Sequence, residues 1–256
     1  IDTINEVMAQ VHAVNPEIIF YGEGWEMCTW TTKDGYVGKM TIQNNAHMVN
    51  GSAGTFAFFN DTIRNAIHGG VFDHTAQGFI SGAPIDDGMN TILTESYLGA
   101  SHWGNANTVC PTPVQTINYA SCHDNYTLID NITLDTPDAT REQHVAMNKL
   151  AAAYYITAQG VPFVHAGEEM LRSKPDANAE TGFNHNSYAS GDAINSIKWN
   201  TLAEDDVWNT REYYKGLIAF RKAHPALRMT NSTEIAKNVL PMDTGDNQVL
   251  AFNILG

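Results

Sequence analysis

Two acidic residues stand where buried strands are expected to end, and they are the side chains in this sequence with the clearest chemical meaning. Glu23 follows an apolar run at residues 18–21. Asp124, with His123 just before it, follows a largely apolar run at residues 116–121. Because the ends of parallel strands open into one pocket, the two carboxylates are predicted to meet there. Two carboxylates are the minimum set of groups for cleaving a glycosidic bond.

Four strand–loop–helix units are expected to position these acids. The predicted strands cover residues 18–21, 55–59, 116–121 and 160–167. The predicted helices cover residues 1–14, 62–67, 92–100, 141–159 and 206–223. Apolar strands that alternate with helices indicate an α/β fold with a parallel sheet covered by helices. Beyond residue 226 the pattern changes to short alternating runs, which indicate β-structure.

Composition excludes several function classes. The net charge of −14 leaves no cationic surface for phosphates, so no nucleic-acid partner is expected, whereas neutral polysaccharides remain compatible. No apolar run reaches transmembrane length, so membrane insertion is not expected, and cytoplasmic and secreted locations both stay open. Cys28, Cys110 and Cys122 form no CxxC pair, and no disulfide framework is predicted.

The remaining histidines and acids do not predict a metal or a cofactor. The ten histidines include no HExxH motif, so no zinc site is expected. Glu168 and Glu169 lie at the end of the fourth predicted strand, where adjacent side chains point to opposite faces. They therefore cannot enter one pocket together, and we interpret them as structural residues with Arg172 as their partner.

Five segments, in the same order along the chain, resemble a known family. Two of them contain the acids, in the sequences YGEGW and NYASCHDNYTLID. The five segments are residues 21–25, 58–64, 118–130, 160–172 and 213–225. Together they resemble type I pullulanase, the α-1,6 debranching branch of the α-amylase superfamily (glycoside hydrolase family 13).

The resemblance implies a (β/α)8 TIM barrel, of which this chain contains the C-terminal half, about strands 5 to 8. Residues 1–226 are expected to form that half barrel. Residues 227–256 are expected to begin a C-terminal β-sandwich domain that the chain leaves incomplete.

The resemblance also implies roles for the site residues. Glu23 matches the acid–base catalyst of the family, and Asp124 matches the aspartate that stabilises the transition state. His123 matches a histidine that binds sugar hydroxyls. Further candidate substrate-binding residues are Trp25, Asn125 and Tyr188. The superfamily allows a calcium ion, for which this sequence shows no D-x-D-x-D-G loop.

The family's nucleophile, an aspartate after strand four, has no match in this sequence. Asp2 lies inside the first predicted helix and is not assigned that role. From the resemblance we expect the parent protein to cleave α-1,6 branches in pullulan, amylopectin or glycogen-derived α-glucans by a retaining mechanism. The chain alone is expected to be inactive and to need the N-terminal half of the barrel as its partner. The alternatives are an α-1,4-acting glycosidase of the α-amylase type and a non-catalytic α-glucan-binding module.

Overall fold

The structure, a computed structural model, describes residues 2–23, 56–100 and 112–255. Its main sheet contains four parallel strands in the order β1-β2-β3-β4. They are β1 (Phe20–Gly22), β2 (Phe56–Phe59), β3 (Thr116–Asn118) and β4 (Val161–Pro162). The parallel sheet expected from the sequence is therefore confirmed.

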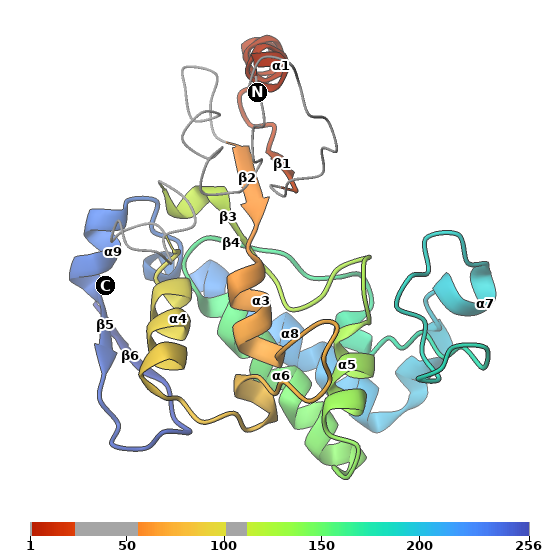
Figure 1. Cartoon of the computed structure of the whole chain (residues 1–256). Helices are drawn as coiled ribbons and strands as arrows, with labels where there is room; N and C mark the ends of the chain where they lie inside the picture. The colour runs from red at the N-terminus through yellow and green to blue at the C-terminus, as the bar shows by residue number, and fades with distance from the viewer. Residues whose placement is uncertain (1, 24–55, 101–111, 256) are drawn as a thin grey trace, which may run out of the picture.

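Helices fill the connections from β2 to β3 and from β3 to β4, and further helices precede β1 and follow β4. The α-helices are α1 (Asp2–Val14), α3 (Asp61–His68), α4 (Asp87–Tyr97), α5 (Leu128–Asp135), α6 (Arg141–Thr157), α7 (Asp192–Asn195), α8 (Asp205–Ala223) and α9 (Ser232–Asn238). Short 3-10 turns are η1 (Phe79–Ser81), η2 (Pro113–Gln115), η3 (Glu168–Met170), η4 (Trp199–Ala203) and η5 (Pro225–Leu227). Figure 1 shows α1 beside the β1 end of the sheet, away from α6 and α8. In the described part of the chain, no helix combines the length and apolar character needed to cross a membrane.

The two faces of the sheet differ in what covers them. On one face, aromatic rings of neighbouring strands meet edge to face, with Phe59 about 5.1 Å from both Tyr119 and Phe163. Tyr21 contacts the same Phe59 ring and remains 50% exposed. The main hydrophobic core contains side chains of α3, α4, α5, α6 and α8. Phe59 and Tyr119 are buried, so Tyr21 on β1 is the exposed part of this aromatic cluster.

A buried cap connects α3 to the sheet. Asn60 directly follows β2, and its side-chain oxygen accepts hydrogen bonds from the backbone N–H groups of Thr62 and Ile63. Its amide nitrogen donates to Thr116 Oγ1 on β3 over 3.2 Å. The start of the helix predicted at residues 62–67 is therefore confirmed to within one residue, and the cap also connects two neighbouring strands.

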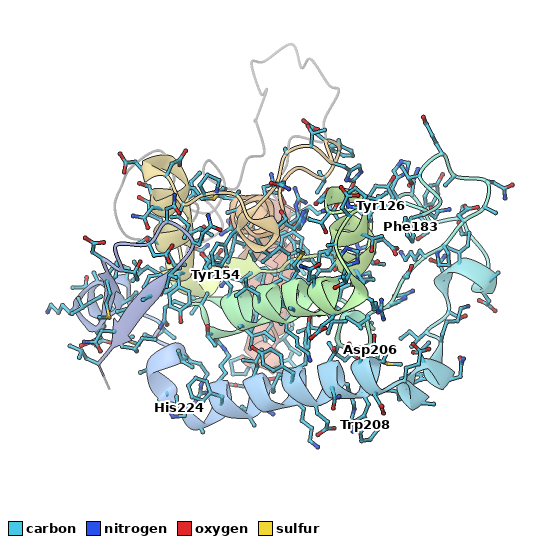
Figure 2. All side chains as sticks on the ribbon, turned by 90° about the horizontal axis from the view of Figure 1, so that it is seen from below. Tyr126, Tyr154, Phe183, Asp206, Trp208 and His224 are labelled. Atoms are coloured by element: carbon cyan, nitrogen blue, oxygen red, sulfur yellow. The ribbon has the colours of Figure 1, made fainter. Side chains whose placement is uncertain are left out.

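Helices α6 and α8 lie side by side, as Figure 2 shows, and a buried arginine joins them. Arg221 on α8 donates to the carbonyl oxygens of Ile156, Ala158 and Gly160 at the end of α6. These carbonyls lie at a helix C-terminus, where no partner exists within the helix. The guanidinium therefore completes α6 while it packs α8 against it.

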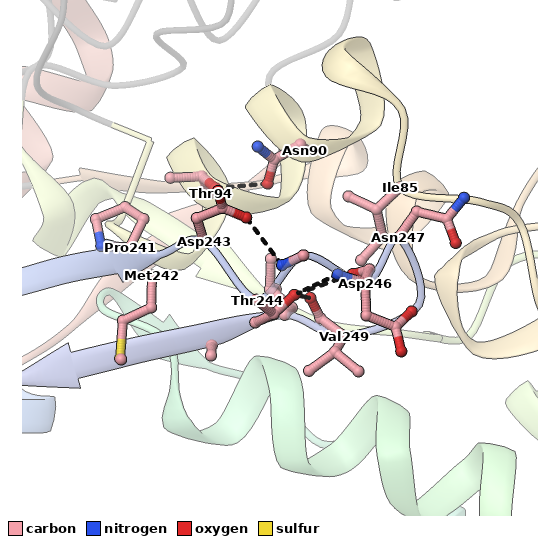
Figure 3. A pocket seen from close by; sticks show the side chains of 13 residues that line it. Ile85, Asn90, Thr94, Pro241, Met242, Asp243, Thr244, Asp246, Asn247 and Val249 are labelled. Atoms are coloured by element: carbon pink, nitrogen blue, oxygen red, sulfur yellow. Dashed lines mark hydrogen bonds between the residues drawn. The ribbon is translucent and has the colours of Figure 1, made fainter.

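The last residues form a two-stranded antiparallel sheet of β5 (Val239–Met242) and β6 (Ala251–Ile254). This sheet packs on α4: the Phe252 ring on β6 stacks on the Tyr97 ring on α4, with the ring centroids 4.0 Å apart. Between α4 and this hairpin lies a surface pocket of about 380 Å³ (Figure 3). None of the described residues that line it is aromatic, and the polar groups of its turn bond mainly to one another.

Several predicted elements are shorter than expected, and three helices were not predicted. The fourth strand ends at Pro162, and the chain then turns through η3, which Gly167 and Leu171 flank with left-handed backbone angles. Glu168 and Glu169 therefore lie on a 3-10 turn and not on a strand. The unpredicted helices are α5, α7 and α9. Of these, α5 starts with a side-chain cap from Thr127 and α9 with one from Asn231.

Candidate active site

The end of β1 and the chain that leaves β3 converge at one edge of the sheet. Glu23 is the first residue after β1. His123 and Asp124 lie a few residues beyond β3, with β2 between the two strands. Parallel strands place their carboxyl ends at the same edge, which explains why residues so distant in sequence meet.

The three side chains form a compact group. Their carboxylate oxygens and imidazole nitrogen all lie within 4.8 Å of one another. His123 Nε2 lies 3.7 Å from Asp124 Oδ1, and the two side chains are 70% and 55% exposed. The expected convergence of Glu23 and Asp124 is therefore confirmed as geometry. An acid and a carboxylate at an open sheet edge can protonate a glycosidic oxygen and stabilise positive charge at the anomeric carbon.

Asn125 shapes the chain directly after Asp124. Its φ angle of +64° is in the left-handed region, which asparagine adopts more readily than most residues. The chain therefore turns sharply after the two exposed side chains and enters α5 within a few residues. Tyr126 then bonds through its hydroxyl to Thr181 Oγ1 over 3.0 Å.

Two further predicted substrate-binding residues are Trp25 and Tyr188. Trp25 lies outside the described residues. Tyr188 is on the loop before α7, and its side chain is 85% exposed. The loop is anchored next to it, because the buried Lys174 donates from Nζ to Ser187 Oγ over 2.7 Å. Asp130 accepts hydrogen bonds from the backbone N–H of Lys174 and from the Ser173 hydroxyl.

A buried acid, Glu168, is hydrogen-bonded to the chain just before the exposed His123 and Asp124. Glu168 accepts hydrogen bonds from the hydroxyls of Ser121, Tyr155 and Tyr214. Burial raises the pKa of Glu168 to about 7, although the three hydroxyl donors oppose the shift. Glu169 instead accepts from the backbone N–H of Gly167. The interpretation of this pair as structural agrees with these contacts, although nothing in the sequence pattern indicated three hydroxyl partners for Glu168.

The expected partner of the two glutamates bonds elsewhere. Arg172 donates to the carbonyl oxygens of Ala166 and Asn195, so it joins two loops. The charge of the Arg172 guanidinium also lowers the pKa of His165, which lines a small pocket together with Glu168. Burial, and then the positive charges of Arg172 and Lys174, lower the pKa of His165 to about 4. His165 is therefore neutral near pH 7.

Glu23, His123 and Asp124 are also close enough together to share a cation. All three are exposed, and exposed acidic groups commonly come this close without an ion. The geometry by itself therefore assigns no metal to them.

Comparison with known proteins places this site in a family context. No protein-family model matches the sequence. The chain is 32% identical over 242 residues to a pullulanase of Bacillus subtilis, a match that spans 93% of this chain and 30% of that protein. Other pullulanases are also similar to it, and so is an isoamylase of Flavobacterium sp, which is 32% identical over 46% of this chain.

Solved structures agree with the sequence comparison. A pullulanase from Paenibacillus barengoltzii matches with a TM-score of 0.84 and 34% identity, over 98% of this chain and 36% of that one. A pullulanase from Bacillus acidopullulyticus matches with a TM-score of 0.82 at the same identity, over 98% of this chain and 28% of that one. The chain thus spans about a third of the length of these pullulanases.

Proposed function

We propose that the protein containing this chain is a retaining glycoside hydrolase that cleaves α-1,6 branch linkages in pullulan, amylopectin or glycogen-derived α-glucans. The observation that carries the proposal is the compact group of Glu23, His123 and Asp124 at the carboxyl edge of a parallel sheet. The similarity to pullulanases over nearly the whole chain supports the linkage. The Paenibacillus barengoltzii pullulanase was crystallised with maltohexaose and α-cyclodextrin, which supports an α-glucan ligand.

In this proposal Glu23 protonates the leaving oxygen and later activates water. Asp124 stabilises the positive charge that develops on the sugar ring, and His123 binds ring hydroxyls. Asn125, Tyr188 and Trp25 contact neighbouring sugar units. No metal or cofactor takes part.

The nucleophile comes, in this proposal, from outside the chain. Residues 1–226 form the C-terminal half of a (β/α)8 barrel, and residues 227–256 begin a β-sandwich domain. The two edge strands of the sheet, β1 and β4, support a continuation of the sheet by other strands. An aspartate supplied by the N-terminal half would attack the anomeric carbon. Its carboxyl group would lie about 5–5.5 Å from that of Glu23, the separation of the two carboxyl groups in retaining enzymes.

The linkage assignment is tested on the full-length protein with pullulan and amylose as substrates. We expect pullulan to be hydrolysed faster, with maltotriose as the product of cutting its α-1,6 bonds. Faster cleavage of amylose would replace the proposal by an α-1,4-acting glycosidase. If the full-length protein binds both glucans and cleaves neither, the chain belongs to a non-catalytic α-glucan-binding protein.

A further inference from the structure

The buried carboxyl group of Glu168 has no role in the mechanism proposed above. Glu168 is 4% exposed and lies on η3, just beyond β4. Its Oε2 accepts a hydrogen bond from Ser121 Oγ over 2.7 Å. Its Oε1 accepts from the hydroxyl of Tyr155 on α6 over 2.7 Å and from that of Tyr214 on α8 over 3.0 Å. Because three elements hold this carboxyl group, its position is fixed.

Ser121 lies where the chain after β3 leaves the core. Ser121 is 5% exposed, and Cys122 is 8% exposed. The next side chain, His123, is 70% exposed. The Ser121 hydroxyl therefore connects the carboxyl group of Glu168 to the chain immediately before the exposed His123 and Asp124.

We propose that Glu168 is a positioning residue, which acts through Ser121 to fix the segment carrying His123 and Asp124. This inference rests on the function proposed above, in which both exposed side chains meet the reacting sugar. Without the bond at Ser121, the segment gains freedom to shift relative to Glu23 on β1. A displacement of about 1 Å between reacting groups can lower a rate about 100-fold.

A purely structural role for Glu168 makes a different prediction. Its bonds to Tyr155 and Tyr214 join α6 to α8, and a group that only joined these helices would affect stability alone. Ser121→Ala separates the two roles, because it removes the bond toward the site and leaves both tyrosine bonds in place. Tyr154→Phe is a matched control: it removes a buried hydroxyl from the adjacent position of α6. That hydroxyl donates to the Leu93 carbonyl and does not contact Glu168.

The experiment compares kcat and KM on pullulan for these two variants and for Glu168→Gln in the full-length protein. We expect Ser121→Ala to lower kcat about 10-fold with KM changed less than about 3-fold. Glu168→Gln keeps groups that can bond to all three hydroxyls, and it should retain most of the activity. Tyr154→Phe should lower the unfolding temperature and leave kcat unchanged. A kcat for Ser121→Ala equal to that of the unmodified enzyme would overturn the inference.

Amide hydrogen exchange provides a readout that does not depend on activity. We expect faster exchange over residues 119–125 in Ser121→Ala than in the unmodified protein or in Tyr154→Phe. If the unmodified protein fails to cleave pullulan, the proposed function is wrong, and the exchange rates still test the positioning role. Equal exchange over residues 119–125 in all three proteins would contradict that role, whatever the substrate.

Discussion

At the residue scale, Glu23 is the group on which the proposed chemistry depends most directly. Glu23→Gln removes the proton that the leaving oxygen needs, so we expect kcat of the full-length enzyme on pullulan to fall about 10²–10⁴-fold. The unfolding temperature should stay unchanged because Glu23 is exposed. On a substrate whose leaving group needs no protonation, such as an activated aryl glucoside, the bond-cleaving step of Glu23→Gln should be slowed less.

The control for Glu23 is Glu17→Gln, which removes an exposed carboxylate from the connection between α1 and β1. It should leave kcat unchanged. If Glu23→Gln kept more than about a tenth of the activity on pullulan, a different residue would have to be the general acid.

Glu168 predicts a pH dependence of stability. Its pKa is about 7 in the folded protein, against 4.5 for an unperturbed glutamate. Between these pH values the folded state binds more protons than the unfolded state, so stability falls as pH rises. From pH 5 to pH 8 the loss amounts to about 2–3 kcal/mol.

The measurement compares unfolding of the unmodified protein and of Glu168→Gln at pH 5 and pH 8. Since glutamine does not titrate, the variant should become more stable relative to the unmodified protein at the higher pH. A difference between the two proteins that is the same at both pH values would show that Glu168 does not hold its proton more tightly when folded.

At the element scale, the structure contains two helix caps of the same residue type in different environments. Asn60 caps α3, is fully buried and also donates to Thr116 on β3. Asn231 caps α9 with the same two kinds of backbone bond, but it is exposed. Asn60→Ala should therefore cost about 2–3 kcal/mol and Asn231→Ala about 1 kcal/mol, because only the first leaves buried groups without partners. Urea denaturation measures both losses, and equal losses would show that the bond from Asn60 to β3 contributes nothing.

At the scale of the whole molecule, the open sheet determines how the chain should behave by itself. Among the strands that the structure describes, β1 and β4 are its edges. Apolar side chains around β1 are exposed, with Ile19 at 73% and Val14 at 88%. Free strand edges and exposed apolar surface favour association. We therefore expect the 256-residue chain to self-associate in light-scattering measurements and to show no pullulan hydrolysis.

Adding the separately purified N-terminal half should suppress the association and restore hydrolysis, because that half is proposed to supply both the missing strands and the nucleophile. The control is the same mixture made with the Glu23→Gln chain, which should assemble and remain inactive. Substantial turnover by the isolated, monomeric chain would contradict the proposed division of the barrel.

The amino-acid sequence by itself determined the parallel α/β architecture and the meeting of the two acids. Periodicity and stop signals predicted α1, α6 and α8 close to their observed limits, because these helices depend on contacts within each segment. The position of Glu23 and Asp124 after apolar runs was sufficient to predict their proximity, since parallel strands share a carboxyl edge. The capping signal at Thr127 was also present, and it could have predicted α5.

Only the tertiary structure decided the surroundings of Glu168. Its hydroxyl partners Ser121, Tyr155 and Tyr214 lie 47, 13 and 46 residues away in the sequence. A hydrogen bond between such distant residues leaves no periodic signal, so the pattern around residue 168 does not indicate burial. The turn after β4 was missed for a related reason, because Leu171 adopts a left-handed conformation there that its residue type does not favour. Packing around a turn supplies the free energy for such a conformation, and packing is a property of the whole fold.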